Sequence, residues 1–404
     1  MRRFRSLLVL AMLLVLAGGC GDEASVTPCD PCDLADFRPG DGETAPLDIV
    51  AADHVELAEE VDAEVDEADV DPDAVVCGDG RIDGRTCSPS ETEWIGGAEA
   101  TLVGVDCDGN PFARTIVTDS TGHFSFENVP SGTHSLTVSK GSFSTEYQVR
   151  VRIGETTDIT SGAQKACLID ESVRIAVVDG AWDSIHHIVD RLGLTFDYYS
   201  DVATLPGGTS AAEALLLDPV ALQAFDIVMI NCGEQYFNFS EGFLETERAT
   251  RRSDMAGNLR AFVEAGGSLY VSDWAYFFVE MGFAELVTFK STDGTYEGGF
   301  TGAAGSVLAD IVGPGLLVAM GKSTVTIDFP LERWVVSDTV SAEVVTMVSG
   351  DVSLLDGSAL NAAPLLFRFR PTPTSGNVLF TSFHNEAQLS EDIERILQQV
   401  IFSL

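Results

Sequence analysis

The stretch FVEAGGSLYVSDWA, residues 262–275, decides the fold. It follows a segment in which Ser253 or Asp254 can cap a helix and apolar residues recur near helical spacing. Gly266 and Gly267 end that helix, and the apolar SLYVSD begins a strand directly afterwards. A helix that leads straight into a buried strand is typical of a β-α-β unit, whose strands pair in parallel. The stretch therefore predicts a doubly wound parallel sheet.

Other apolar runs on either side of this stretch extend the same sheet. VRIAVVDG at 173–180, FDIVMINCG at 225–233 and VLFTSF at 378–383 are continuous apolar runs, as in strands buried on both faces. SIHHIVDRLGL follows the first run as a helix, and SEDIERILQQVIFSL closes the chain as another, capped by Ser390. Between them, residues 284–375 contain strand-like runs and Gly-rich turns. We therefore predict an α/β domain over residues 172–404 with β-rich additions.

Residues 92–162 have a different pattern, with short alternating runs between turn residues. This pattern is typical of a small antiparallel β-sandwich. Within TDSTGHFSFENVPSGTHSLTV, Phe124 and Phe126 should point to one face, and Pro130 and Gly132 turn the chain. The segment resembles the carboxypeptidase regulatory-like domain, a prealbumin-like sandwich. Related domains are grouped with carbohydrate-binding folds, so the resemblance implies glycan binding through the sandwich as one alternative.

The N-terminus has the features of an export signal. Three arginines within the first five residues precede the apolar SLLVLAMLLVLA, which is too short to span a bilayer comfortably. The LAGGC that follows resembles the lipobox of bacterial lipoproteins, which implies cleavage after residues 1–19 and lipidation of Cys20. We expect an exported protein, lipid-anchored to the cell envelope at the outer membrane. An ordinary secretory signal is the alternative.

Residues 20–91 form an acidic linker. From Asp41 to Val76 there are 14 Asp or Glu residues and no Lys or Arg. Such a segment buries too little apolar surface to offset its ordering entropy, so we predict a disordered stalk. The whole chain has 63 acidic against 23 basic residues and a formal charge of −40, which excludes nucleic acid as a partner. The expected partners are the membrane, through the lipid, and an extracellular glycan or protein.

The eight cysteines fit an oxidising compartment. Lipidated Cys20 leaves seven, of which six can form disulfides and Cys232 remains. The expected pairs are Cys29 with Cys32, Cys77 with Cys87, and Cys107 with Cys167.

Chemistry is expected where parallel strands end, because open sheets bind ligands beyond the carboxyl ends of their strands. The polar residues at these positions are Asp179, Asn231, Cys232, Ser272, Asp273, His384 and Glu386. The passages FVEAGGSLYVSDWA and VLFTSFHNE resemble the class I glutamine amidotransferase-like fold, whose last strand ends in Phe-His-Pro-Glu. The resemblance implies a flavodoxin-like sheet, with His384 and Glu386 as triad members.

The resemblance fails at the nucleophile. The position of the family's catalytic Cys holds Asp273, or Ser272 with a shift of one residue. Glutamine hydrolysis needs a thiolate beside an imidazole, so we predict a non-catalytic domain that binds or scaffolds at the envelope. A hydrolase using His384 and Glu386 with Ser272, Asp273 or Cys232 is the alternative.

Metal binding is a further alternative. Asp179, Asp273 and His384 offer two carboxylates and an imidazole, which together can ligate a divalent ion. We nevertheless predict neither a metal nor a cofactor.

Overall fold

The structure is a computed structural model. It describes residues 77–160, 165–169, 171–202, 210–233, 245–291, 296–384 and 391–404, all within the unit Asp71–Leu404. The signal segment, most of the acidic linker, Cys20, Cys29, Cys32 and Glu386 lie outside these ranges. Within them, no helix combines the length and the apolar composition needed to cross a membrane.

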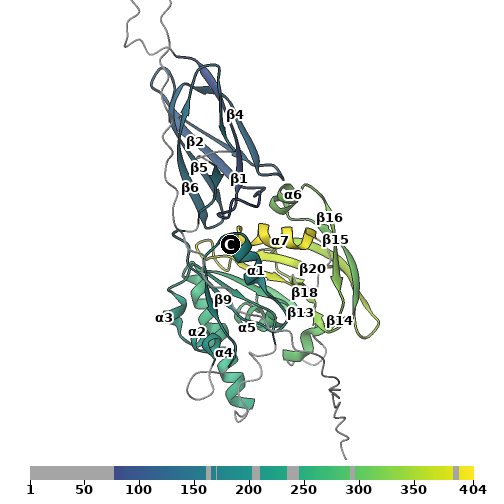
Figure 1. The fold of residues 1–404 in the computed structure, drawn as a ribbon. Helices are drawn as coiled ribbons and strands as arrows, with labels where there is room; N and C mark the ends of the chain where they lie inside the picture. Colours follow the sequence, from purple (N-terminus) through teal and green to yellow (C-terminus); the bar gives the residue numbers. More distant parts are fainter. Residues whose placement is uncertain are drawn as a thin grey trace, which may run out of the picture. The chain divides into compact units, whose positions relative to one another are not determined.

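The N-terminal part is a sandwich of two sheets (Figure 1). One sheet has the order β4-β1-β7, with the short β8 also paired to β1, and the other has the order β3-β2-β5-β6. The strands are β1 (Asp79–Cys87), β2 (Glu99–Val105), β3 (Pro111–Val117), β4 (His123–Pro130), β5 (Gly132–Lys140), β6 (Phe143–Val151), β7 (Thr156–Ile159) and β8 (Ala166–Cys167).

The inward faces of these strands alternate as the sequence predicts. Phe124 and Phe126 of β4 are both 2% exposed and meet edge to face, with ring centroids 6.0 Å apart. Gly84 of β1 lies opposite Phe124, and a Cβ added there would come within 2.5 Å of that ring. A small residue is therefore required where the two aromatic rings fill the interior.

Strand β1 corrects the predicted domain boundary. It lies in the segment that we assigned to the linker, yet it pairs antiparallel with β4 and parallel with β7. The sandwich therefore begins at Asp79 rather than at residue 92. Two features hid this strand in the sequence. Its residues, DGRIDGRTC, are mostly polar because only alternate side chains are buried, and its partner strands are distant in sequence.

The predicted disulfide pairs of the described cysteines are wrong. The bonds join Cys77 to Cys107 and Cys87 to Cys167. Cys77 precedes the extended β1 and Cys87 is its last residue, so their positions are separated by roughly 30 Å at about 3.3 Å per residue. A disulfide needs Cα atoms about 5.5 Å apart. Instead, Cys87 lies directly beside Cys167 in the parallel pairing of β1 with β8.

The α/β part contains a nine-stranded sheet with the order β10-β9-β11-β12-β21-β20-β19-β15-β16. The first five strands pair in parallel, as predicted from residues 262–275, and the last four are antiparallel. The bounds are β9 (Ile175–Val178), β10 (Asp197–Tyr199), β11 (Ile227–Ile230), β12 (Ser268–Ser272), β15 (Gly305–Ile311), β16 (Thr324–Phe329), β19 (Val345–Ser353), β20 (Ala359–Phe369) and β21 (Val378–Thr381).

Two short antiparallel strand pairs belong to the β-rich section predicted over 284–375. They join β13 (Val287–Phe289) to β18 (Ser337–Val340) and β14 (Phe300–Gly302) to β17 (Trp334–Val335). The helices are α1 (Ile185–Arg191), α2 (Ala211–Leu217), α3 (Pro219–Leu222), α4 (Glu245–Glu264), α5 (Phe277–Gly282), α6 (Pro314–Met320) and α7 (Glu391–Ile401), with 3-10 turns η1 (Asp273–Tyr276) and η2 (Tyr296–Gly299).

Helix α4 begins earlier than predicted. It starts at Glu245, so Ser253 and Asp254 lie within the helix and do not cap it. The first eight residues of the helix, ETERATRR, include the good helix formers Glu, Arg and Ala. They form no apolar stripe, so the sequence pattern did not mark them as helical.

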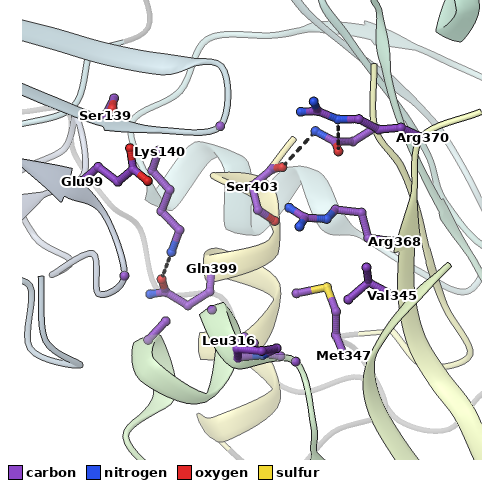
Figure 2. A pocket seen from close by; sticks show the side chains of 17 residues that line it. Glu99, Ser139, Lys140, Leu316, Val345, Met347, Arg368, Arg370, Gln399 and Ser403 are labelled. Atoms are coloured by element: carbon purple, nitrogen blue, oxygen red, sulfur yellow. Dashed lines mark hydrogen bonds between the residues drawn. The ribbon is translucent and has the colours of Figure 1, made fainter. Parts of the chain in front are cut away.

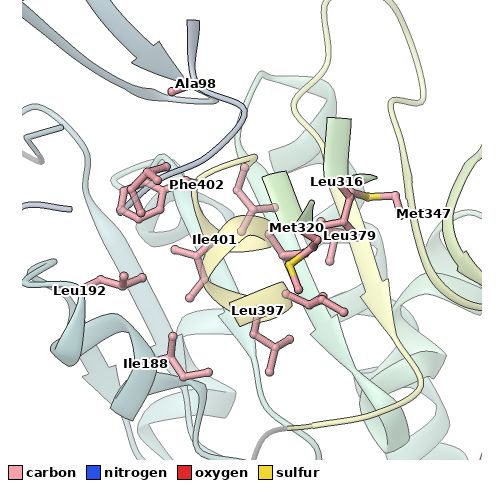
Figure 3. Packing of buried hydrophobic residues seen from close by; sticks show 14 of the residues in the cluster. Ala98, Ile188, Leu192, Leu316, Met320, Met347, Leu379, Leu397, Ile401 and Phe402 are labelled. Atoms are coloured by element: carbon pink, nitrogen blue, oxygen red, sulfur yellow. The ribbon is translucent and has the colours of Figure 1, made fainter. Parts of the chain in front are cut away.

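Each buried strand of the sheet faces two cores. In β12, Leu269 and Val271 belong to the core that contains the buried side chains of α2, α4 and α5. Tyr270 between them belongs to the other core, to which α1 and α7 contribute. Figure 3 shows Ile188 and Leu192 of α1 near Leu397 and Ile401 of α7 in this second core. The sheet is thus covered on both faces, and its strand ends are left to form a site.

Candidate functional site

Three neighbouring parallel strands bring Cys232, Asp273 and His384 together. Ile230 pairs with Val271, and Ser272 pairs with Thr381, so β11, β12 and β21 end at the same edge of the sheet. Cys232, Asp273 and His384 follow these strands within three residues. One potential ligand atom from each lies within 4.8 Å of the other two. The predicted gathering of strand ends therefore occurs for these residues.

Asp273 occupies a strained turn directly after β12. Its φ is +40°, a left-handed conformation that is uncommon outside glycine, and its side chain is only 4% exposed. Oδ1 accepts the Val335 N–H at 2.7 Å, and Oδ2 lies 3.6 Å from the Cys232 sulfur. Burial raises the pKa of Asp273 to about 7, although the nearby His384 works in the opposite direction.

Cys232 is held in place by its backbone. Its N–H donates to Ser272 Oγ at 2.9 Å, and its carbonyl accepts the Trp182 N–H at 3.0 Å. The side chain is 1% exposed, and burial, reinforced by the charge of Asp273, raises the pKa of the thiol well above its ordinary value. The neutral thiol donates to Asp273 Oδ2. In this state Cys232 is not a poised thiolate.

We expect Cys232 to resist thiol reagents in the native protein, because its sulfur is buried and protonated. In a chain carrying Cys20→Ser, Cys29→Ser and Cys32→Ser, an aromatic disulfide reagent should label less than about 0.1 thiol per native chain. It should label about one thiol after denaturation. Rapid labelling of the native chain would contradict the buried position of the sulfur.

Ser272 supports its neighbours rather than facing the cleft. It is fully buried, and its hydroxyl donates to Asp183 Oδ2 at 2.7 Å while it accepts from the Cys232 N–H. It does not line the cleft above Asp273. The arrangement gives no support to Ser272 as a nucleophile, since an attacking hydroxyl must reach a substrate.

His384 is half-buried and lines the same cleft as Cys232 and Asp273. Its Nδ1 is buried without a hydrogen-bond partner among the described residues. Glu386, the predicted third member of a triad, lies outside the described residues, as does Asn385.

Asp179 and Asn231 bond to backbone groups outside this cluster. The Asn231 Oδ1 accepts the N–H of Ile185 at 3.2 Å, at the start of α1. Asp179 Oδ1 accepts the Gly180 N–H, and burial, together with the charge of Asp179, raises the pKa of Asp201 to about 6. Neither residue lines the cleft. The third member beside Asp273 and His384 is therefore Cys232 rather than Asp179.

Aromatic and apolar side chains form the walls of the cleft, which encloses about 250 Å³. Trp182 is 45% exposed and meets Trp274 edge to face at 6.2 Å. The Trp274 indole N–H donates to the Arg333 carbonyl at 2.8 Å, which fixes that ring. The segment 328–334, from the end of β16 to the start of β17, also lines the cleft.

Sequence reasoning missed the segment 328–334. Its sequence, DFPLERW, places Phe329, Leu331 and Trp334 in and around a turn between two strands, and Leu331 is 66% exposed. Apolar residues clustered at a turn, of which Leu331 is exposed whereas Phe329 and Trp334 are buried, were the available signal, because such patches often mark binding sites.

A second cavity of about 380 Å³ is lined by basic side chains (Figure 2). Lys140 of β5 donates to the Gly96 carbonyl at 2.6 Å and to the Gln399 side chain of α7. Arg368 and Arg370 of β20 line the same cavity. Burial lowers the pKa of Lys140 to about 7.

This pKa predicts that stability rises with pH. Between about pH 7 and its ordinary pKa, Lys140 is neutral in the native state and protonated in the unfolded state, so the unfolded state binds more protons. From about pH 7.5 to about pH 9 its contribution should increase the free energy of unfolding by about 2 kcal/mol. Urea denaturation of the native chain and of Lys140→Met at both pH values measures the difference. Equal pH slopes in the two chains would contradict it.

Comparisons with known proteins identify the N-terminal domain. No curated protein matches the chain. A ThuA-like protein from Parabacteroides merdae is a structural match with 12% identity and a TM-score of 0.33, covering 56% of this chain and 88% of that chain. The exo-beta-1,4-mannosidase Op5Man5 from an Opitutaceae bacterium matches with 12% identity and a TM-score of 0.28, covering 57% of this chain and 34% of that chain. The sequence profile of the carboxypeptidase regulatory-like domain matches residues 82–162, which therefore carry a domain of this type, as their strand pattern predicts.

Proposed function

We propose that this chain is a lipid-anchored surface protein whose α/β domain binds a saccharide in the cleft above Cys232, Asp273 and His384. The proposal has three parts: the anchor, the loss of amidotransferase chemistry, and the ligand. The LAGGC motif at Cys20 and the acidic segment after it support the first part. Mass analysis of the N-terminal peptide from a bacterial host tests it, and an unmodified Cys20 would contradict it.

Two observations support a fold of the amidotransferase type without its chemistry. The parallel strands have the order β10-β9-β11-β12-β21, which in chain order is 2-1-3-4-5, the flavodoxin-like order. The turn after β12 has the strained conformation of a nucleophile elbow, but it holds Asp273. The nearby thiol follows another strand, and burial raises its pKa well above the ordinary value, which disfavours the thiolate that forms the thioester in glutamine hydrolysis.

The aromatic cleft is the observation that carries the ligand proposal. Small-molecule sites are concave and mostly apolar, with a few polar groups that fix orientation. Here Trp182 and the face of Trp274 that is not stacked on Phe300 offer apolar surface of the kind that packs on the C–H face of a sugar ring. Asp328, Glu332 and Arg333 line the cleft with groups that can bond hydroxyls.

Binding of the full chain to an array of mono- and oligosaccharides tests this part. We expect Trp274→Ala and Trp182→Ala each to weaken the binding of any glycan found by at least about 10-fold. Trp94→Ala is the matched control, because Trp94 packs on Arg85 in the sandwich. Loss of binding in the control alone would place the glycan site in the sandwich instead of the cleft. Absence of any glycan binding would contradict the proposal.

Hydrolysis is the second candidate function, and the environment of Asp273 favours it. A carboxyl group with a pKa of about 7, beside an imidazole and at the base of a cleft, is suited to proton transfer. Release of a chromophore from aryl glycosides or esters, abolished in Asp273→Asn, would establish it.

A further inference from the structure

The cluster at the base of the cleft contains three different metal-binding groups. Cys232 offers a thiol, Asp273 a carboxylate and His384 an imidazole, each from a different strand end. Among the described residues, it is the one group of at least three His, Cys, Asp or Glu side chains whose ligand atoms all lie within 4.8 Å of one another. Cysteine, histidine and aspartate are the side chains that zinc prefers in proteins.

The distances require only a small contraction. In a tetrahedral zinc site with bonds of about 2.0–2.3 Å, neighbouring ligand atoms lie roughly 3.3–3.8 Å apart. The Cys232 sulfur and Asp273 Oδ2 are already 3.6 Å apart, and no ligand atom in the group is more than 4.8 Å from another. Shifts of about 1 Å or less would bring every pair of ligand atoms into that range.

Hydrogen bonds around the cluster orient the ligands as they do in metal sites, where outer groups fix the inner ones. The Val335 N–H holds Asp273 Oδ1 and leaves Oδ2 directed at the sulfur. The Ser272 hydroxyl and the Trp182 N–H hold the two backbone groups of Cys232, and Asp183 in turn accepts from Ser272.

Two features of the cluster cost free energy when no ligand is bound to it. The buried His384 Nδ1 has no hydrogen-bond partner among the described residues, and an unpaired buried polar atom costs free energy. Asp273 keeps a left-handed backbone and a carboxyl group away from water. A divalent cation bound at Nδ1 would compensate for both, because it would pair that nitrogen and, with the thiol proton released to solvent, balance the charges of the carboxylate and the thiolate.

We propose that Cys232, Asp273 and His384 bind one zinc ion whose fourth coordination position opens into the aromatic cleft. Three protein ligands and one open position are the arrangement of catalytic rather than structural zinc sites. The bound ion would supply a polarising centre for an oxygen atom of a molecule in the cleft. The inference does not depend on saccharide binding, since it concerns the floor of the cleft alone.

Cobalt(II) is the probe, because a cobalt–thiolate bond has a near-ultraviolet charge-transfer band and tetrahedral cobalt has intense visible bands. The test uses the full chain with Cys20→Ser, Cys29→Ser and Cys32→Ser, so that Cys232 is the remaining free thiol. We expect one equivalent of cobalt to produce both sets of bands and one equivalent of zinc to abolish them. Cys232→Ser should lose the thiolate band, and Asp273→Asn and His384→Ala should weaken cobalt binding by at least about 10-fold.

Two controls separate this site from other metal binding. His187→Ala removes an exposed histidine on α1 and should leave cobalt affinity unchanged. Zinc should raise the melting temperature of the parent chain and of His187→Ala, but not that of Cys232→Ser, whose folding is checked by its own melting transition. A thiolate band that is absent from the parent, or that persists in Cys232→Ser, would overturn the proposal. Weak binding of many equivalents by the acidic residues alone would overturn it as well.

Discussion

Replacing Phe380 by alanine is expected to lower the free energy of unfolding by about 3–5 kcal/mol. Phe380 lies in β21, the strand shared by the parallel and antiparallel halves of the sheet, and it is fully buried. Its ring packs against Phe367 and Phe289, with centroids 5.2 and 5.1 Å away. Truncation removes these contacts and leaves a cavity that rigid neighbouring strands cannot close.

Leu308→Ala is the matched control for Phe380→Ala. Leu308 lies in β15 of the same sheet but is 71% exposed, so its loss should change the free energy of unfolding by less than about 0.5 kcal/mol. Urea denaturation followed by far-ultraviolet circular dichroism measures both variants. A cost below about 1 kcal/mol for Phe380→Ala would show that β21 does not occupy the centre of the sheet.

Removal of the Cys87–Cys167 disulfide is expected to be comparably costly. The bond joins residues 80 positions apart, and in the chain-entropy account closing a loop of this length contributes about 4.5 kcal/mol. The Cys77–Cys107 bond spans 30 positions and should contribute about 3.5 kcal/mol. The double variants Cys87→Ala/Cys167→Ala and Cys77→Ala/Cys107→Ala compare the two bonds under the same denaturing conditions.

Reduction of the native chain provides an independent measurement of the two bonds. Cys77 is exposed, whereas Cys87 is fully buried. A mild reductant should therefore open Cys77–Cys107 first, because thiol–disulfide exchange requires access to a sulfur atom. Mass spectrometry of trapped thiols follows the order. Earlier opening of Cys87–Cys167, or equal stability of the two double variants, would contradict the assigned pairing.

The parallel sheet could be predicted from sequence because its signals are local. Residues 262–275 contain the end of a helix, a glycine pair and a buried strand in one continuous passage. The sandwich core was predictable for the same reason, since Phe124 and Phe126 alternate within one strand. Where each element's own residues determine its type, periodicity and turn chemistry are sufficient.

The composition of the site was less predictable, because it depends on which strands are neighbours. Sequence shows that Asp179, Cys232, Asp273 and His384 all follow strands. It does not show that β11, β12 and β21 are adjacent, or that Asp179, directly after β9, does not line their cleft. The metal-ligand set taken from the sequence accordingly contained Asp179 in place of Cys232. The cleft wall at 328–334 was missed because antiparallel strands from a long insertion position it.

The Cys87–Cys167 bond has a mechanical consequence. A pull applied between the N-terminal segment and the α/β domain reaches Cys87 at the end of β1 and passes through the sulfur atoms to Cys167. The intervening polypeptide, which contains β2 to β7, lies outside this path. Such a pull would therefore leave most of the sandwich strands unloaded while the bond is intact. In a reducing environment the same pull would extend the sandwich strand by strand.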